Sequence, residues 1–163
     1  MVSRSRQALV EELAQYDRLL EIGIGNRPTV ARSLADRGRE VVAVDVAVGE
    51  RTRAAADETD EAMIAGSLRA VEGDVLVLAE AANDERGGGT GLGEFDAVYA
   101  CNLPAELQRP TVALADRLDA ACLFTTLGFE EPTVSVSRRS LPGTTVYVAR
   151  DGFRGPDASD PGR

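Results

Sequence analysis

The stretch that decides the fold of this chain is Leu19-Leu20-Glu21-Ile22-Gly23-Ile24-Gly25-Asn26-Arg27-Pro28. Its apolar first half is typical of a buried parallel strand, its two glycines allow a sharp turn, and its proline suits the start of a helix. Glycines let a ligand approach the backbone, and the free N–H groups of a helix start attract negative charge. The stretch therefore predicts a strand–turn–helix cradle of the kind that nucleotide-binding folds use.

The residues after the turn predict a βαβ unit. The spacing of Val30, Ala31, Leu34 and Ala35 gives a helix one apolar face, and the glycine at position 38 ends it. The run 41–45, Val-Val-Ala-Val-Asp, is apolar on both faces, as a parallel strand covered by helices should be. Strand, helix and strand at this spacing form a right-handed parallel crossover.

The remaining apolar runs complete the expected architecture. Helices are expected over 5–16, 51–64, 75–82 and 102–119, and strands over 68–71, 95–101, 121–126, 133–137 and 144–149. The link between the fifth strand and the next is too short for a parallel crossover, so the last two strands should form an antiparallel hairpin. The sequence predicts an α/β fold with a three-layer, doubly wound, Rossmann-like, mostly parallel sheet in the order 3-2-1-4-5, plus that hairpin.

The domain organisation is simple. Residues 1–150 should form a single Rossmann-like domain of the methyltransferase type, with the glycine-rich run 87–93 as a surface loop. The tail 151–163, rich in Gly, Pro, Asp and Ser, should be disordered. No apolar run is long enough for a membrane span, and two cysteines in 163 residues make no disulfide framework, so we expect a cytoplasmic protein. The oligomeric state stays open.

The composition narrows the choice of partners and chemistry. Acidic residues number 27 against 18 basic ones, all of the latter arginine, and the net charge is −9. Such a charge argues against non-specific nucleic-acid binding. An acidic chain without lysine indicates a halophilic cytoplasm, where salt screens self-repulsion, although a GC-rich genome also favours arginine. The chain has no histidine, so a general base must be a carboxylate, cysteine, tyrosine or water.

The glycine turn matches two ligand-binding patterns, each incompletely. A dinucleotide fingerprint needs a third glycine where Pro28 stands, and the methyltransferase turn needs one where Arg27 stands. Glu21, two residues before Gly23, is the acid that the methyltransferase pattern contains. We expect Glu21, Gly23, Gly25 and Arg27 to bind the cofactor, with Arg27 offering a charge-assisted pair to a carboxylate. The alternative is a tight turn that binds nothing.

Three further polar residues follow expected strands. Asp45 ends the second strand, where an acid binds the ribose hydroxyls of an adenosine, although such an aspartate can also cap a turn. Asp74 follows the third strand, where it could accept from an adenine amine or form an Asx-turn. Asn102 follows the fourth strand and is the candidate catalytic residue, with a helix N-cap as its alternative role. No metal-ligand spacing occurs, and Cys101 and Cys122 are expected to be core thiols.

The chain also resembles a small archaeal family of unassigned function, over roughly residues 5–150. The resemblance is carried by four segments: 20–28, 42–45, 72–75 and 97–110. It implies a Rossmann-like, methyltransferase-like fold whose activity is not established. The glycine-rich 87–93 loop and the tail depart from the family pattern, and neither is expected to touch the crevice.

These observations favour an uncharacterised, methyltransferase-like protein that binds the small molecule S-adenosylmethionine, with an unknown methyl acceptor. One alternative is a regulatory domain that binds NAD or an adenine nucleotide. Another is a non-enzymatic Rossmann-like protein that has lost its ligand. The short link after the fifth strand supports the last alternative, because it leaves out the helix that usually helps to build an acceptor site.

Overall fold

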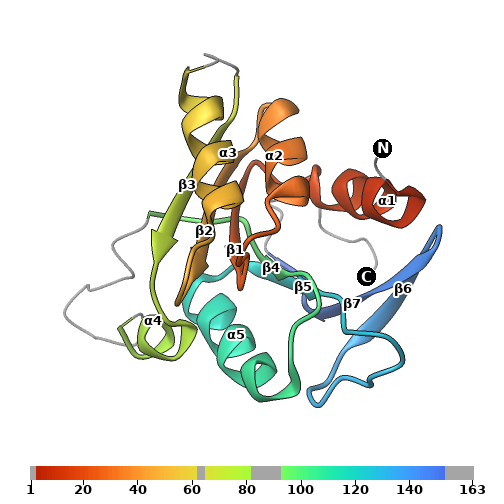
Figure 1. Ribbon diagram of the computed structural model, residues 1–163. Coiled ribbons are helices and arrows are strands. Elements are labelled where there is room, and N and C mark those ends of the chain that lie inside the picture. The colour runs from red at the N-terminus through yellow and green to blue at the C-terminus, as the bar shows by residue number, and fades with distance from the viewer. Residues whose placement is uncertain (1–2, 62–64, 82–92, 153–163) are drawn as a thin grey trace.

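A computed structural model describes residues 3–61, 65–81 and 93–152 of this chain (Figure 1). Within these residues seven strands form one sheet in the order β3-β2-β1-β4-β5-β7-β6. The strands are β1 (Arg18–Ile22), β2 (Glu40–Asp45), β3 (Ser67–Glu72), β4 (Ala97–Ala100), β5 (Ala121–Phe124), β6 (Ser137–Leu141) and β7 (Thr144–Arg150). The first five are parallel, and β7 runs antiparallel to both β5 and β6. The predicted α/β class and the order 3-2-1-4-5 are confirmed.

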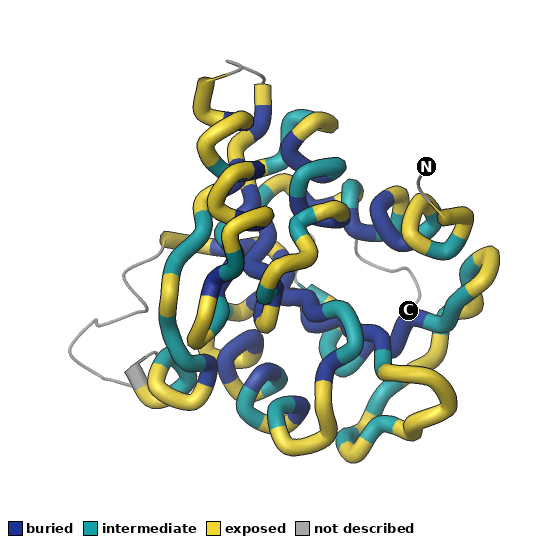
Figure 2. Tube along the Cα trace, in the orientation of Figure 1, coloured by how far each residue is buried: buried dark blue, intermediate teal, exposed yellow. Residues whose placement is uncertain are grey.

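Helices cover both faces of the sheet (Figure 1). One face carries α1 (Arg4–Leu13), α2 (Thr29–Asp36) and α3 (Glu50–Glu61), and the other carries α4 (Val75–Ala81) and α5 (Ala105–Leu118). The strands between these layers are mostly buried, and the outer faces of the helices are exposed (Figure 2). No described helix is long and apolar enough to cross a bilayer.

The alternation of side chains along β1 and β4 determines which residues share a face. Leu19 packs in the apolar cluster under α1 and α2, whereas Leu20 and Ile22 pack in the cluster under α4 and α5. Because strand side chains alternate, Glu21 lies on the same face as Leu19. Tyr99 also belongs to that face, and it pairs in register with Glu21. The two polar side chains are therefore neighbours across the sheet.

The boundaries of the C-terminal hairpin differ from the sequence expectation. The predicted strand 133–137 is wrong: the first hairpin strand is β6, which begins at Ser137. The two residues Pro142 and Gly143 make the turn, with Gly143 at φ 80°, so Leu141 and Thr144 are register partners. The apolar residues Val134 and Val136, which suggested a strand, pack instead against the cluster under α5.

The other element predictions agree closely with the structure. The run after Asp74 is the helix α4, as predicted, and α5 ends at Leu118 before Asp119, which has a left-handed φ of 56°. Most of the predicted 87–93 loop and most of the predicted disordered tail lie outside the described residues.

Candidate functional site

The turn after β1 is built on two glycines with positive φ. Gly23 has φ 78° and Gly25 has φ 55°, values that side chains disfavour. The N–H of Gly23 donates to the carbonyl of Val44 on β2 at 2.8 Å. Pro28 then precedes the first residue of α2, so one N–H donor is missing at this helix start. The predicted order of strand, glycine turn and helix is confirmed.

One side of this turn is tied to the start of α3. The N–H of Gly25 donates to Asp45 Oδ2 at 2.6 Å, and its carbonyl accepts from the N–H of Gly49 at 3.0 Å. The side-chain oxygen of Asn26 accepts from the N–H of Arg51, in the first turn of α3, at 2.7 Å. These bonds occupy the backbone donor that a phosphate would need at Gly25.

On the other side of the turn, a buried carboxylate is held by a tyrosine. Tyr99 donates its hydroxyl to Glu21 Oε1 at 2.6 Å, and Glu21 is only 2% exposed. The second oxygen of Glu21 has no hydrogen-bond partner among the described residues. Because Glu21 lines a hollow, this oxygen can accept a hydrogen bond from a ligand that enters it.

The surroundings of Glu21 raise the pKa of its carboxyl group. Burial raises the pKa of Glu21 to about 7, against the lowering effects of the Tyr99 hydrogen bond and the positive charge of Arg27, while Asp45 raises it further. Burial and the nearby Glu21 raise the pKa of the Cys101 thiol well above its usual range. A raised pKa disfavours the thiolate, which is the nucleophilic form of a cysteine.

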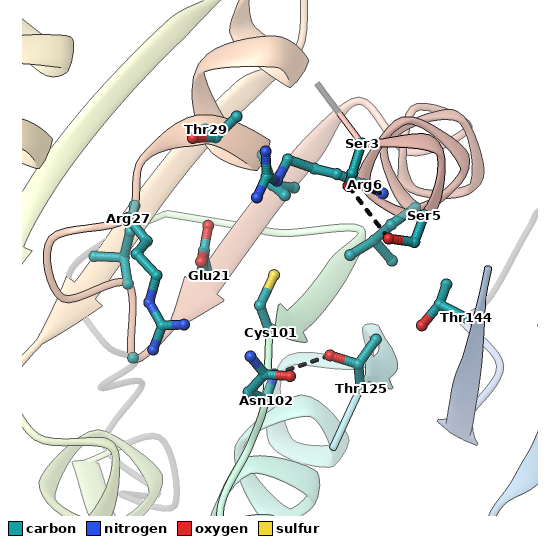
Figure 3. A pocket seen from close by; sticks show the side chains of 14 residues that line it. Ser3, Ser5, Arg6, Glu21, Arg27, Thr29, Cys101, Asn102, Thr125 and Thr144 are labelled. Atoms are coloured by element: carbon teal, nitrogen blue, oxygen red, sulfur yellow. Dashed lines mark hydrogen bonds between the residues drawn. The ribbon is translucent and has the colours of Figure 1, made fainter. Parts of the chain in front are cut away.

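Glu21 lies in a hollow of about 240 Å³ on the α1 side of the sheet (Figure 3). Residues from α1, the glycine turn, the start of α2 and the ends of four strands (β1, β4, β5 and β7) line this hollow, which we call the Glu21 hollow. The lining residues are Ser3, Ser5, Arg6, Leu9, Glu21, Gly23, Ile24, Arg27, Thr29, Val30, Cys101, Asn102, Thr125 and Thr144. In Figure 3, Arg27 and Thr144 lie at opposite sides, with Glu21, Cys101 and Asn102 between them.

Two of the lining residues are arginines without acidic partners. Seven described arginines form ion pairs: Arg18, Arg32, Arg39, Arg53, Arg138, Arg139 and Arg150. Neither Arg6 nor Arg27 pairs with any acid in the described part of the chain. The Glu21 hollow therefore contains one buried carboxylate and two cations that are free to meet a ligand.

Comparison with known proteins identifies the family. A UPF0146 protein of Halobacterium salinarum is 37% identical over 140 residues, which are 85% of this chain and 92% of that protein. The model of the uncharacterised protein family UPF0146 matches residues 4–64. This chain belongs to that family. The resemblance to an archaeal family of unassigned function is thereby confirmed, and the relative comes from a halophile.

Several solved methyltransferase structures resemble this chain. An RNA methyltransferase from Salinibacter ruber, in complex with S-adenosyl-L-homocysteine, superposes with a TM-score of 0.56 at 17% identity over 99% of both chains. An O-methyltransferase family protein from Burkholderia thailandensis gives a TM-score of 0.54 at 16% identity over 91% of this chain and 57% of its own length. These superpositions establish a methyltransferase-like fold. Sequence identities this low establish nothing about the reaction.

The structure brings four of the predicted site residues into one place. Glu21, Gly23, Arg27 and Asn102 all line the Glu21 hollow. Asn102 has a left-handed φ of 58°, and its N–H donates to Thr125 Oγ1 at 2.9 Å. This bond joins the ends of β4 and β5 and fixes the backbone of Asn102 at the hollow.

The other three predicted residues do not line the hollow: Gly25 is in the turn itself, and Asp45 and Asp74 lie beyond it. Asp45 holds the N–H groups of Gly25 and Ala47, at 2.6 and 3.1 Å. Asp74 Oδ1 accepts from the N–H of Leu76 at 2.9 Å, the Asx-type contact that the sequence left open. Both carboxylates thus serve local structure, and each retains unused lone pairs, because a carboxylate can accept about four hydrogen bonds.

Sequence reasoning missed Tyr99, Arg6 and Thr125. A signal for Tyr99 existed: a tyrosine inside an otherwise apolar strand needs a hydroxyl partner, and Glu21 was the acid in the neighbouring strand. No sequence signal identified Arg6, because its place depends on how α1 packs on the sheet. Cys101, expected in the core, is half-buried and lines the hollow.

Proposed function

We propose that this protein binds S-adenosylmethionine at the Glu21 hollow and across the glycine turn, as a methyltransferase whose acceptor is not yet identified. One observation carries the proposal: a buried carboxylate with a free oxygen and an unpaired arginine face the same hollow. An α-amino acid group has one ammonium and one carboxylate, and it needs such a pair of opposite charges.

The charges of the hollow suit the amino-acid end of this cofactor. The free oxygen of Glu21 would accept from the ammonium, and the guanidinium of Arg27 would donate to the carboxylate. Ligand pockets usually have volumes of about 300–1,000 Å³. At about 240 Å³ the hollow accommodates one end of such a ligand, so the rest must lie over the turn.

The strand ends beyond the turn suit an adenosine. Asp45 and Asp74 follow neighbouring strands, and their remaining lone pairs can accept from ribose hydroxyls and an adenine amine. Val46 is 70% exposed directly after Asp45, and Leu76 is 48% exposed in the first turn of α4. These apolar side chains offer a surface on which a purine could pack.

Bound here, S-adenosylmethionine would supply a methyl group on a positively charged sulfur. Glu21 would hold and orient the ligand, Tyr99 would fix the Glu21 carboxylate, and Asn102 would border the reacting end as the candidate catalytic residue. The methyltransferase from Salinibacter ruber, bound to S-adenosylhomocysteine, supports this choice of ligand. The two free cysteines fit our expectation of a cytoplasmic protein in a halophilic cell.

The structure offers less to a dinucleotide. A pyrophosphate binds to bare N–H groups at a helix start. Here Pro28 has no N–H, and the N–H of Gly25 already donates to Asp45. A nicotinamide or adenine nucleotide therefore remains an outcome of the test, as does a protein that has lost its ligand.

The test is a thermal and calorimetric titration with S-adenosylhomocysteine, NAD and ATP. At one hundred times its dissociation constant, S-adenosylhomocysteine should add about 2.7 kcal/mol of stability, a rise of roughly 5–10 °C in Tm. Arg27→Gln should weaken binding about tenfold or more, because a charge-assisted hydrogen bond is lost. Arg37→Gln is the matched control, since Arg37 is exposed and does not line the hollow.

The alternative results are distinct. A Tm that rises with NAD or ATP and not with S-adenosylhomocysteine would replace this proposal with a nucleotide-binding regulator. A Tm unchanged by every adenosine ligand would indicate a fold that has lost its ligand. Equal loss of affinity in Arg27→Gln and Arg37→Gln would remove Arg27 from the site.

A further inference from the structure

The loop that follows β5 presents large apolar side chains to solvent. Leu127 is 62% exposed, and Phe129 is fully exposed at the tip of the loop. The two other phenylalanines in the described part of the chain, Phe95 and Phe124, are buried. Single exposed apolar residues are common, but two large ones together on one turn mark an interaction surface. We call residues 126–131 the Phe129 loop.

Hydrogen bonds hold the Phe129 loop in a tight turn. The N–H of Glu130 donates to the carbonyl of Leu127 at 3.1 Å, and the hydroxyl of Thr126 donates to the carbonyl of Glu130 at 2.8 Å. Just beyond the loop, the N–H and the hydroxyl of Thr133 donate to Oε1 of the buried Gln108 on α5, at 2.7 and 3.0 Å. These bonds preorganise the loop, so little conformational entropy would be lost when a partner binds its apolar tip.

A groove beside the loop has room for a large side chain. Two open hollows of about 690 and 380 Å³ lie along α5 and share Arg109 and Ala113 as lining residues, and we call them together the α5 groove. Pro110 of α5 also lines it, as do Thr133 and Val134, which come just after the Phe129 loop. The segment between β5 and β6 lies beside α5 (Figure 1). The loop and the groove are therefore neighbours on the surface.

The loop and the groove also offer opposite charges. Glu130, at the end of the turn, and Arg109, in the groove, are both exposed, and neither forms an ion pair with a described residue. Two acids, Glu106 and Asp116, also line the groove, and Arg150 pairs with Asp116. The guanidinium of Arg109 therefore keeps its donors for an acid from outside the chain.

We propose that two copies of this chain associate as a symmetric dimer, in which Phe129 of each copy sits in the α5 groove of the other. In its own chain Phe129 is fully exposed and leaves the groove open. In a two-fold symmetric interface a patch meets the same patch of its partner, so a projection and a groove that are neighbours can each receive the other. Arg109 of each copy would then donate to Glu130 of the other, beside a buried aromatic ring. Aromatic and arginine side chains are enriched at the centres of such interfaces.

The net charge of the chain makes this contact dependent on salt. With −9 on each copy, two copies repel each other at low ionic strength. The Debye length shortens from about 10 Å at 0.1 M salt to about 3 Å at 1 M, so concentrated KCl screens the repulsion while the ring stays buried. Association should therefore strengthen as KCl rises, whereas binding of a polyanion such as a nucleic acid would weaken.

The experiment is analytical ultracentrifugation of the full chain over a range of protein and KCl concentrations. We expect a monomer–dimer equilibrium that shifts toward the dimer as KCl rises. Phe129→Ala should raise the dissociation constant of the dimer about tenfold or more, because a central aromatic anchor is lost. Val77→Ala is the matched control, since Val77 is also apolar and 61% exposed, but belongs to α4 and does not line the groove.

An exchange of charges tests whether the partner is a second copy. At one KCl concentration, Arg109→Glu and Glu130→Arg should each weaken the dimer, because each places like charges opposite one another. The double variant Arg109→Glu/Glu130→Arg should restore the dimer, because it recreates the pair with the charges reversed. Both positions are exposed, so the Tm of these variants should stay close to that of the wild type.

Several outcomes would overturn the inference: a monomer at every concentration, equal effects of Phe129→Ala and Val77→Ala, a double variant as weak as the single ones, or open-ended assembly beyond the dimer. If the chain stays monomeric and Phe129→Ala weakens binding of S-adenosylhomocysteine, the loop serves a ligand and the dimer is wrong. The inference is independent of the proposed cofactor, so a dimer without S-adenosylhomocysteine binding, or binding without a dimer, would leave one proposal standing.

Discussion

The two sides of the glycine turn differ in how their polar groups are satisfied. On the α3 side, Gly25, Asn26 and Asp45 bond to other parts of the chain, and Thr52 donates its hydroxyl to the Gly25 carbonyl at 2.8 Å. On the hollow side, one oxygen of Glu21 and the guanidinium of Arg27 have no described partner. The polar groups of the first side are used within the fold, whereas those of the second side remain available to a ligand.

This difference changes the interpretation of the strand-end acids. Asp45 is the last residue of β2 and Glu21 the last but one of β1, and the sequence analysis assigned both to cofactor binding. In the structure Asp45 receives two backbone N–H groups, whereas Glu21 receives one tyrosine hydroxyl and keeps a free oxygen. By this contrast, the polar groups left open by the fold make Glu21 a stronger candidate for binding a ligand than Asp45, although both lie near strand ends.

The strongest test of the α3 side is Gly49→Ala. The added Cβ would lie 2.3 Å from Asn26 Oδ1 and 2.5 Å from Asn26 Cβ, so rotating the asparagine cannot relieve the overlap. Overpacking and the loss of the Asn26–Arg51 bond should together cost about 3 kcal/mol of unfolding free energy. Chemical denaturation measures that change.

A double variant sharpens this test. The double variant Asn26→Gly/Gly49→Ala lacks the overlapping asparagine side chain, so it should be more stable than Gly49→Ala. It should still be about 1 kcal/mol less stable than the wild type, because the hydrogen bond from the Arg51 N–H to Asn26 is lost. If the unfolding free energy of Gly49→Ala lies within about 1 kcal/mol of the wild-type value, the contacts between the turn and α3 contribute less to stability than we expect.

The next largest effect is expected on the hollow side, from Glu21→Gln. Folded Glu21 keeps its proton up to about pH 7, and an unfolded glutamate loses it near the model value of 4.5. Between these values the folded state binds more protons, so wild-type stability falls as the pH rises. Glutamine removes this loss, and the variant should exceed the wild type by up to about 3 kcal/mol at pH 8 and by little below pH 5.

Denaturation midpoints of both proteins across this pH range measure the effect. Glu11→Gln, an exposed change on α1, should follow the wild type at every pH. A constant difference between Glu21→Gln and the wild type would contradict a raised pKa at Glu21. Added stability together with lost affinity for S-adenosylhomocysteine would be the expected signature of a binding residue.

The smallest of the three effects is expected for Asp45→Ala. Two hydrogen bonds from backbone N–H groups to a half-buried carboxylate are lost, at a cost of about 2 kcal/mol. Asp45→Asn keeps an acceptor oxygen and should lose less. A variant as stable as the wild type, yet weaker in binding the cofactor, would show that Asp45 serves the ligand and not the turn.

Much of the fold followed from local patterns. A few adjacent residues were enough to predict the strand before Gly23, the strand that ends at Asp45 and the end of α2 at its glycine. β6 escaped prediction because it is an edge strand whose sequence, Ser-Arg-Arg-Ser-Leu, has no apolar alternation. The short Pro142-Gly143 turn sets the pairing of β6 with β7. The predicted strand 133–137 was placed too early because Val134 and Val136 alternate as in a strand.

The candidate site was predictable only in its local part. Glu21, Gly23 and Arg27 belong to one motif, so the sequence identified them together. Their separation from Asp45 depends on which side of the turn each side chain takes, and that depends on hydrogen bonds across twenty or more residues. Arg6 reaches the hollow through the packing of α1 against the hairpin, which no local pattern records.

The hollow is lined by Ser3, which caps α1, and by Thr144, which begins β7. A nascent chain that has emerged as far as α3 can form the glycine turn, because the partners of that turn on β2 and α3 are already present. It cannot close the hollow until β7 has also been synthesised. The hollow therefore forms after the turn, so chains that stop before β7 would compete little for the ligands of this protein.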